Sequence, residues 1–546
     1  MATNARPYDA QKMTTRQFTD QLISMHGGAF NEILHPDGYI EGVLTFGPPG
    51  IGKTHCSMAA AREMAQDNNC ELVIYKPGLK ATPGKREMLF VHMSMAGMTS
   101  GGIAGFPTVK DKDKIQPGDT DTEKAEKTRR YVSQQVIPEI WRVAMDYERV
   151  VYLFDEITHV VSQEAMLSLL SEGFYAETEL SKRALFIATA NEGIADGTLP
   201  QKLSTAFRNR FTAYYMRADV DTWRKDFANV TVHPCLLAYA KLYSDKFETF
   251  QMPKDNLLNI PTLRGLTMMS DELRYFEARK YRRRNAQGDV DPRGELIEDT
   301  QISPADEFQL QRLAYGRLGD DMMANDFVAL YSLAFKSVVP EVNKIIAGKI
   351  DTVSTEFKNA LNTDSDESVA RQKAALAGKS SQEKLKDGQN AMALKYTYID
   401  YLPRLILESL ERLPSNPKIM AHAKNQPVFK SVKWDENGDK LPNQVRDAYA
   451  SMLMGYFLDA VLLLPPKDQL VAIIHLKELS FTQESREKFA DFTGGKPTTG
   501  TPAPFYALMA KLTEQSAKNT QASRLSKALE IAHASQQTLN TLDIGS

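Results

Sequence analysis

The feature that most restricts the fold of this chain is a glycine-rich segment between an apolar run and an alanine-rich run. The segment is Gly47-Pro48-Pro49-Gly50-Ile51-Gly52-Lys53-Thr54, which fits the phosphate-binding pattern Gly-x-x-x-x-Gly-Lys-[Ser/Thr]. The run Glu41–Phe46 before it predicts a short buried strand, and Thr54–Ala65 after it predicts a helix. Because a helix N-terminus attracts anions, this order of elements indicates a nucleotide site rather than a chance glycine turn.

The side chains of this segment suit distinct parts of a nucleotide. Glycines allow backbone N–H groups to approach phosphate oxygens without a Cβ in the way. Lys53 can place a positive charge on the β- and γ-phosphates, and Thr54 can supply a hydroxyl ligand for Mg²⁺. The residues expected to bind the nucleotide here are Gly47, Pro48, Pro49, Gly50, Ile51, Gly52, Lys53, Thr54 and His55.

Two later apolar runs end in polar side chains that could complete the site. Arg149–Phe154 is typical of a central parallel strand and is followed by Asp155 and Glu156. Since ligands bind at the carboxyl ends of parallel strands, Asp155 is suited to hold Mg²⁺ through water and Glu156 to polarise the attacking water. The third strand, Ala184–Ala190, ends at Asn191, whose amide could contact the γ-phosphate. The alternatives are solvated strand ends for the acidic pair and a turn residue for Asn191.

In their order along the chain, these segments resemble those of AAA+ ATPases. The resemblance rests on the phosphate-binding loop, the Asp155-Glu156 strand end, Ala188-Thr-Ala-Asn191, and Leu203-Ser-Thr-Ala-Phe-Arg-Asn-Arg-Phe211. It covers about residues 41–340. It implies an α/β fold with a parallel sheet flanked by helices, a helical lid, and hydrolysis of ATP with Mg²⁺.

The same resemblance assigns roles to three arginines. Arg210 matches the arginine finger that acts on the nucleotide of the neighbouring subunit, and Arg208 is a second candidate. The alternative for Arg210 is a structural ion pair with a nearby carboxylate. Pro261-Thr-Leu-Arg264 is similar to the sensor-2 segment, and this chain has Leu-Arg where the family usually has Pro-Arg. Arg264 is therefore a further nucleotide-binding candidate.

A second glycine-rich stretch, Met95–Pro107, is expected to be a loop, followed by a helix over about Thr128–Tyr147. The stretch is similar to a segment of the MoxR-like branch of AAA+ proteins. It is either a mobile loop that presents Phe106 to a protein partner or an ordinary surface loop. The basic run Arg279–Arg284 could touch nucleic acid, but at a helix end it more often complements the helix dipole.

At 546 residues the chain should contain several domains. The expected division is an N-terminal extension (1–40), an α/β nucleotide-binding domain (41–218), a helical lid with following helices (219–345), a linker or exposed helix (346–390), and a mainly α-helical C-terminal domain (391–546). The last of these carries no catalytic pattern. It is expected to select a substrate or partner and to fold separately from the rest.

Composition bears on nucleic-acid binding, the redox compartment and membrane insertion. The net charge of −3 gives no global basic field for nucleic acid, and three cysteines without metal-ligand spacing indicate a reducing, cytoplasmic compartment. The apolar run Ala448–Leu464 is short and contains Asp459, which favours a buried core helix over a membrane span.

The sequence therefore predicts a MoxR-like AAA+ motor that hydrolyses ATP and remodels a protein partner. The expected assembly is a homo-oligomeric ring, with a hexamer as the expected size. The unknown partner would bind through Met95–Pro107 and the C-terminal domain. One alternative is a nucleic-acid motor, which would need basic channel-facing loops. Another is a nucleotide-dependent scaffold that does not hydrolyse ATP.

Overall fold

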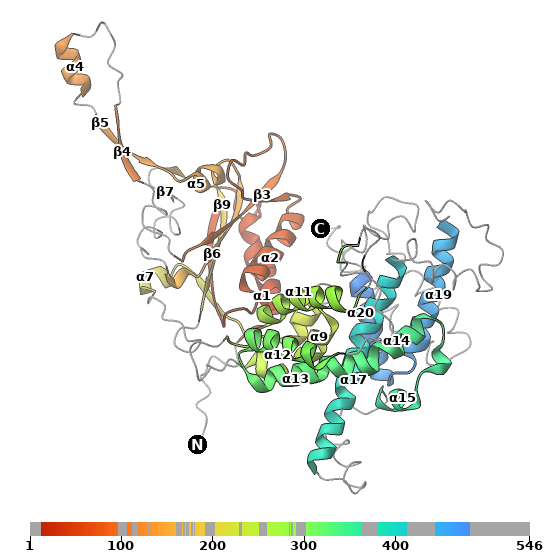
Figure 1. Cartoon of the computed structure of the whole chain (residues 1–546). Helices are drawn as coiled ribbons and strands as arrows, with labels where there is room; N and C mark the ends of the chain where they lie inside the picture. Colours follow the sequence, from red (N-terminus) through yellow and green to blue (C-terminus); the bar gives the residue numbers. More distant parts are fainter. Residues whose placement is uncertain are drawn as a thin grey trace. The chain divides into compact units, whose positions relative to one another are not determined.

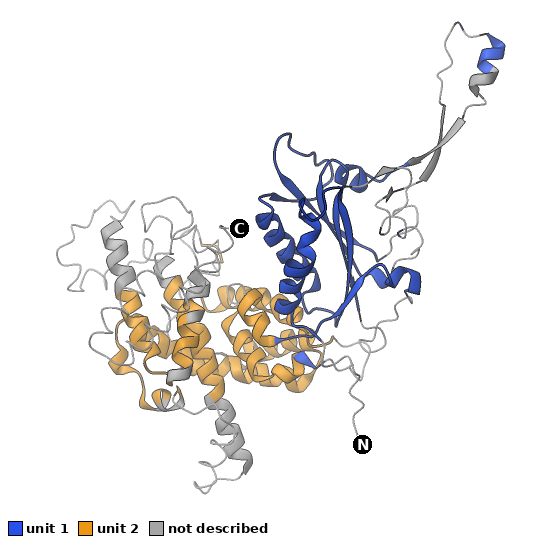
Figure 2. Cartoon of the chain, turned by 180° about the vertical axis from the view of Figure 1, so that it is seen from behind, with its two compact units in different colours: residues 1–219, 248–252 blue, residues 220–247, 253–546 orange. Residues whose placement is uncertain are grey.

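The computed structural model describes residues 12–96, 106–111, 120–128, 131–159, 181–191, 203–228, 232–249, 259–282, 302–361, 381–411 and 443–480, with a few single residues and short stretches between them. The chain forms two compact units (Figure 2). The first comprises residues 1–219 and 248–252, and it is an α/β unit. The second comprises residues 220–247 and 253–546, and its described elements are helical.

The first unit is built on a six-stranded sheet in the order β10-β1-β9-β6-β3-β2 (Figure 1). Its strands are β1 (Tyr39–Phe46), β2 (Glu71–Ile74), β3 (Glu87–Ser94), β6 (Arg149–Asp155), β9 (Arg183–Ala190) and β10 (Thr212–Tyr215). Every neighbouring pair in this sheet is parallel. The parallel α/β fold predicted from the sequence is confirmed.

The central strands are apolar because the sheet is covered on both sides. All eight residues of β9 are buried, and in β6 only Asp155 is partly exposed. The rings of Tyr152 and Phe186 stack across these strands with centroids 4.7 Å apart. Trp141 of helix α5 (Glu139–Ala144) is fully buried and packs on Tyr152. Helix α2 (Lys53–Asp67) also packs against the sheet.

The segment before β1 packs on the same unit. Helix α1 (Thr15–Gln21) begins at a capping box formed by Thr14 and Gln17, and it continues as a π-helical turn, Leu22–His26. The His26 imidazole lies 2.6 Å from a Glu41 carboxylate oxygen and 2.8 Å from the Tyr214 hydroxyl. These contacts tie the N-terminal segment to β1 and β10.

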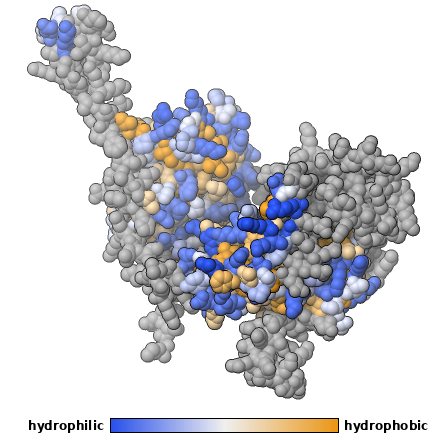
Figure 3. Space-filling model, in the orientation of Figure 1, coloured by the Kyte–Doolittle hydropathy of each residue, from blue (hydrophilic) through white to orange (hydrophobic). Residues whose placement is uncertain are grey.

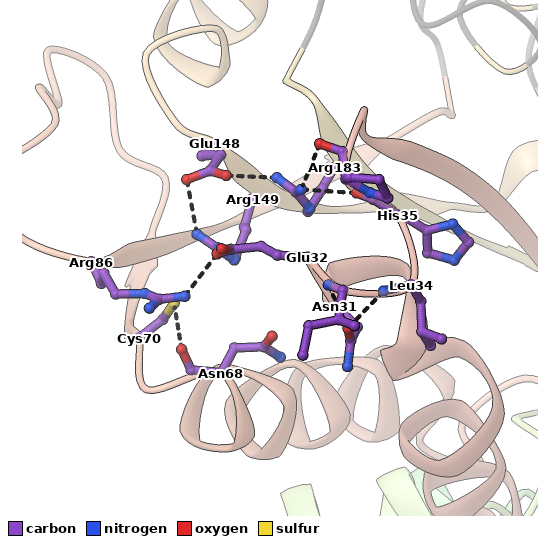
Figure 4. Close-up of polar contacts among 12 residues, drawn as sticks. Asn31, Glu32, Leu34, His35, Asn68, Cys70, Arg86, Glu148, Arg149 and Arg183 are labelled. Carbon is purple, nitrogen blue, oxygen red and sulfur yellow. Dashed lines mark hydrogen bonds and ion pairs between the residues drawn. The ribbon is translucent and has the colours of Figure 1, made fainter.

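At the amino ends of β6 and β9, a cluster of charged residues fastens the chain just before β1 (Figure 4). Arg149 is buried and pairs with Glu32 and with Glu148, the latter at 3.1 Å. Arg183, also buried, donates to the other Glu148 oxygen at 2.6 Å, and Arg86 reaches Glu32 at 2.9 Å. This network lies at the sheet edge opposite the carboxyl ends of the strands.

The structure describes only the two ends of the second glycine-rich stretch. Phe106–Asp111 is strand β4, and it pairs antiparallel with strand β5 (Tyr131–Val136) so that Phe106 faces Val136 in register. Residues 97–105 of the expected loop lie outside the described residues. Met95 is fully buried at the end of β3.

The single helix expected over Thr128–Tyr147 is wrong. The structure has helix α4 (Asp121–Thr128), then β5, then the short α5. Tyr and Val residues in 131–136 favour a strand. Pro138 occupies the N-cap of α5, and the residue before a proline is disfavoured in a helix.

The second unit contains the predicted lid helices and helices from the C-terminal region. The main ones are α9 (Pro234–Leu242), α11 (Leu263–Lys280), α12 (Pro304–Leu318), α13 (Asp321–Leu333), α14 (Val339–Ile346), α15 (Thr355–Leu361), α17 (Ser381–Glu411), α19 (Asn443–Val461) and α20 (Pro466–Ser480). The expectation of a mainly helical C-terminal region is confirmed for the described residues.

Helix α17 contains the start of the C-terminal domain expected from Ala391 onward, and it packs on α9. Its buried Asp400 accepts two hydrogen bonds from Arg224, at 2.8 and 2.7 Å. Its Tyr401 hydroxyl lies 3.4 Å from the Cys235 sulfur of α9. Polar composition around residues 362–390 suggested a boundary, but the apolar face of α17 is covered by lid helices. Residues 362–380, 412–442 and 481–546 lie outside the described part.

Within the described residues, no helix is long and apolar enough to cross a membrane. The face of the molecule drawn in Figure 3 mixes hydrophilic and hydrophobic residues over the described surface. In the run expected to be a core helix, Leu453, Phe457 and Leu458 are fully buried in α19.

Candidate nucleotide-binding site

The glycine-rich loop joins β1 to α2 at the carboxyl edge of the sheet, as the sequence predicts. Gly50 and Gly52 have φ angles of 77° and 99°, which non-glycine residues rarely adopt. A Cβ on Gly47 would lie 2.8 Å from the Ile51 side chain and 3.0 Å from the Met216 carbonyl oxygen. Gly52 is the N-cap of α2 and has no side chain to occupy the place where an anion would lie at the helix N-terminus.

Lys53 connects this loop to the end of β9. Its ammonium donates hydrogen bonds to the carbonyl oxygens of Gly47 and Pro48, at 2.6 and 3.0 Å, and to Asn191 Oδ1 at 3.0 Å. The side chain is 9% exposed, so its charge lies in a poorly solvated place beside the loop. Lys53 and Asn191 are thus brought together as the strand-end argument predicts.

Thr54 and Asp155 also meet. The Thr54 hydroxyl donates to Asp155 Oδ2 at 2.9 Å, and the Thr189 hydroxyl donates to Asp155 Oδ1. His92 Nε2 lies 3.4 Å from the same Oδ2 atom that Thr54 contacts. Burial alone would raise the pKa of Asp155, but hydrogen bonds from His92, Thr189 and Thr54 outweigh it and hold the pKa well below its usual value. Asp155 is therefore a carboxylate at neutral pH.

This pair of oxygen ligands fits a magnesium ion. Mg²⁺ prefers oxygen ligands and commonly uses one or two protein side chains, with phosphate and water completing its shell. Thr54 and Asp155 supply a hydroxyl and an ionised carboxylate side by side. Among the described residues there is no group of three or more His, Cys, Asp or Glu side chains arranged to hold a metal alone.

Glu156 follows the end of β6 in an unusual backbone conformation. Its φ angle is 59°, in the left-handed region, and its N–H donates to the Thr189 hydroxyl at 3.2 Å. The residue is exposed. A strained backbone of this kind costs about 1–3 kcal/mol and is commonly found at functional sites. This backbone conformation ends the strand and gives the Glu156 side chain a different direction from the one that an extended backbone would give.

The two arginine-finger candidates lie at and after a short helix, α7 (Thr205–Arg208), which is capped by Ser204. Arg208 is exposed. Arg210 donates to the Ala206 carbonyl oxygen at 2.7 Å, and its Nε is buried without a hydrogen-bond partner. In the part of the chain that the structure describes, no carboxylate lies within ion-pair distance of Arg210. The arginine finger and the structural ion pair therefore both remain predictions for Arg210.

Arg264 and His55 are the remaining two candidates for nucleotide contacts. Arg264 is an exposed residue in the first turn of α11, in the second unit. His55 is exposed in the first turn of α2, and partial burial of its ring, together with the Arg62 charge, lowers its pKa. Both remain predictions as nucleotide contacts.

Sequence reasoning missed two residues of the site, Thr189 and His92. Thr189 lies two positions before Asn191, so the strand-end argument could have included it. His92 is a polar, exposed residue in a strand otherwise made of buried apolar residues at 88–91 and 93. That break in the apolar pattern was the available signal.

A family model matches the part of the chain that contains this site. Residues 43–217 match the model of the family described as ATPase family associated with various cellular activities (AAA). Among curated proteins, none matches the chain. A solved structure of the Aeropyrum pernix ORC2 protein in ADPNP–ADP complexes aligns with 93% of this chain and 96% of its own, at 11% identity and a TM-score of 0.25. The chain thus carries an AAA ATPase domain, of the nucleotide-binding P-loop type, at residues 43–217.

Proposed function

We propose that this protein hydrolyses ATP and uses the energy to remodel a protein partner, as a MoxR-like AAA+ motor. The observation that carries the proposal is the convergence of Lys53, Thr54, Asp155 and Asn191, from three separate segments, on one edge of the sheet. Thr54 and Asp155 lie 101 residues apart in the sequence. A structural role alone gives no reason to gather an ammonium, a hydroxyl, a carboxylate and an amide there.

Each side chain has a task in water attack on the γ-phosphate. The glycine-rich loop and the N-terminus of α2 bind the phosphates, and Lys53 leaves its carbonyl partners to contact the β- and γ-phosphates. Mg²⁺, held by Thr54 and Asp155, supplies charge that offsets the negative phosphates when it is bound. Glu156 accepts a proton from the attacking water, and Asn191 orients the γ-phosphate.

The arrangement of Arg210 supports a site completed by a second copy of the chain. Its Nη1 donates to the Ala206 carbonyl oxygen of the short helix α7. An arginine supplied in trans stabilises charge on the transferring phosphoryl group. A head-to-tail interface of this type repeats until a ring closes, for which a hexamer is the expected size. Arg208 is the second candidate for the same role, and Arg264 of the lid is proposed as a nucleotide contact.

The unknown protein partner is proposed to bind Met95–Pro107, with Phe106 as the contact, and the C-terminal domain. Phe106 is the first residue of β4, which pairs with β5. An aromatic side chain can bind peptides of many sequences through apolar contact, without specific hydrogen bonds. Replacing Phe106 with alanine should leave basal ATP turnover near normal and remove stimulation by the partner. The three cysteines are free, which fits the reducing cytoplasm that we propose as the compartment.

ATP turnover by the full-length chain, with Mg²⁺ and with EDTA, tests this function. Wild type should turn over only with Mg²⁺, and Lys53→Ala should lose nucleotide binding. Arg62→Ala is a matched control, because Arg62 is an exposed basic residue on the same helix. Binding without Mg²⁺-dependent turnover would favour the scaffold alternative. Stimulation of turnover by DNA or RNA would favour the nucleic-acid motor.

A further inference from the structure

We propose that His92 is a positioning residue that orients Asp155 for Mg²⁺, so that the metal-dependent part of nucleotide affinity depends on it. This inference rests on the proposed function, since it concerns the same site. It adds a residue from β3, a strand that sequence reasoning did not connect with the site. The inference is based on three contacts to the Asp155 carboxylate, from Thr54, Thr189 and His92.

The Asp155 carboxylate is held by three different elements. Thr54 of α2 contacts Oδ2 at 2.9 Å, and Thr189 of β9 contacts Oδ1. His92 of β3 contacts Oδ2 at 3.4 Å from the other neighbouring strand. Two hydroxyl groups that can each rotate hold the carboxylate loosely, and the His92 contact to Oδ2 from a third direction restricts it further.

The strand register explains how His92 reaches the carboxylate. β3 pairs with β6 so that His92 lies beside Leu153 and Ser94 lies beside Asp155. The Met95 N–H donates to the Asp155 carbonyl oxygen at 2.8 Å, which fixes the backbone of the two strand ends together. The His92 side chain therefore approaches Asp155 from a rigid strand rather than from a loop.

Burial along β3 indicates that His92 is not a packing residue. Residues 88–91 and Met93 are buried and apolar, whereas the His92 side chain is 42% exposed. An imidazole at this position contributes little to the core. Within the described residues, the His92 imidazole contacts Asp155, the carboxylate that would hold the metal.

The consequence follows from the strict geometry of Mg²⁺. The ion requires near-ideal octahedral coordination, so a ligand that rotates away weakens its binding. Groups that orient a metal ligand typically change metal affinity by about 10- to 100-fold when they are removed. Thr54 would still contact Asp155 Oδ2 in a His92 variant. Nucleotide binding without metal does not use the Asp155 carboxylate, so it should not change.

The test is a binding titration on the full-length chain with a fluorescent, non-hydrolysable ATP analogue, at a series of Mg²⁺ concentrations and in EDTA. His92→Ala should raise the Mg²⁺ concentration needed for tight binding by about 10- to 100-fold, with affinity in EDTA unchanged. His92→Gln should restore most of the loss, because its amide N–H can donate from a similar place. Ser94→Ala, at the next exposed position of β3, should match wild type.

The outcomes separate this inference from the function on which it rests. A wild-type protein that binds the analogue no better with Mg²⁺ than in EDTA would overturn the proposed function and the role of His92 with it. A wild type that responds to Mg²⁺ while His92→Ala responds identically would overturn only the role of His92. Equal losses with Mg²⁺ and in EDTA, or no rescue by His92→Gln, would show a structural role and also contradict the proposal.

Discussion

The Thr54 hydroxyl and the Asp155 carboxylate lie 2.9 Å apart although 101 residues separate them in the chain. The contact joins the first turn of α2 to the carboxyl end of β6. It exists because β9 lies between β1 and β6 and brings both strand ends to one edge of the sheet. The same edge carries Asn191 beside Lys53.

The Asn191 amide should matter for turnover more than for binding. Asn191→Ala removes a polar group that we expect to act on the γ-phosphate, so ATP turnover should fall by about a hundredfold, with a change in ATP affinity of less than about tenfold. Asn191→Asp should instead weaken binding, because a carboxylate beside Lys53 would compete with the phosphates. Asn209→Ala, an exposed control in the same unit, should behave as wild type. Equal turnover in Asn191→Ala and wild type would make Asn191 a turn residue.

The Arg224–Asp400 pair should be important for the stability of the second unit. Asp400 is 1% exposed and accepts two hydrogen bonds from Arg224. Removing one partner of a buried pair costs about 3–5 kcal/mol, so Asp400→Ala should lower the urea midpoint of this unit markedly. The exposed pair of Lys241 and Asp221 is the control, and Asp221→Ala should cost no more than about 1 kcal/mol.

A related expectation concerns truncation. A fragment ending at residue 360 would lack α17 and uncover the lid surface that α17 packs against, including the Cys235 contact with Tyr401. Such a fragment should aggregate or show a less stable lid in hydrogen exchange. A soluble fragment with a lid as protected as in the full-length chain would show that α17 is dispensable.

Glu277 should make the stability of the second unit fall in acid. Burial raises its pKa, but His233, Arg282 and Tyr331 outweigh it and lower the pKa from 4.5 to about 2. Burial lowers the pKa of His233, and its Nδ1 accepts the Cys235 N–H, so the neutral ring donates to Glu277 from Nε2.

A folded-state pKa below the unfolded value stabilises the fold above the unfolded pKa and loses that stability as pH falls toward the folded pKa. The Glu277 contribution should therefore be lost as pH falls from the unfolded-state pKa of 4.5 toward about 2. Unfolding free energies across this range should show the loss in wild type. Glu277→Gln should be less stable at pH 7, with a flatter acid limb. Parallel acid limbs in the two proteins would assign the pH dependence to other groups.

Arg210 should act across a subunit interface. Arg210→Ala and Glu156→Gln should each be nearly inactive alone, since an arginine finger contributes about 10³-fold or more to turnover. In mixed rings, an Arg210→Ala subunit keeps its own Glu156 and can use Arg210 of a Glu156→Gln neighbour. Random equal mixing makes roughly a quarter of the interfaces competent, so partial activity should return. Rings shown to contain both variants but lacking activity would place Arg210 outside the neighbouring site.

The sequence predicted the sheet and most of the site because both follow from local patterns. Apolar runs such as Arg149–Phe154 favour buried parallel strands. The polar residues at their carboxyl ends then lie at the same edge of the sheet. The pairing of β4 with β5 could not be predicted in the same way, because the charged residues around Lys110–Lys127 show no hydrophobic periodicity. Pro138, which begins α5, interrupts the helix expected there. His92 was missed because its partner lies on a different strand. The packing of α17 on the lid depends on surfaces far apart in sequence, which composition alone does not pair.

The most direct test of the account compares Glu156→Gln with wild type in nucleotide binding and in steady-state ATP turnover. Glu156 lies next to Asp155, and its N–H is held by Thr189. Because the amide cannot accept the proton of the attacking water, turnover should fall by about 10²- to 10⁴-fold while Mg²⁺-dependent ATP binding is retained. Wild-type turnover no faster than that of Glu156→Gln would contradict hydrolysis at this site.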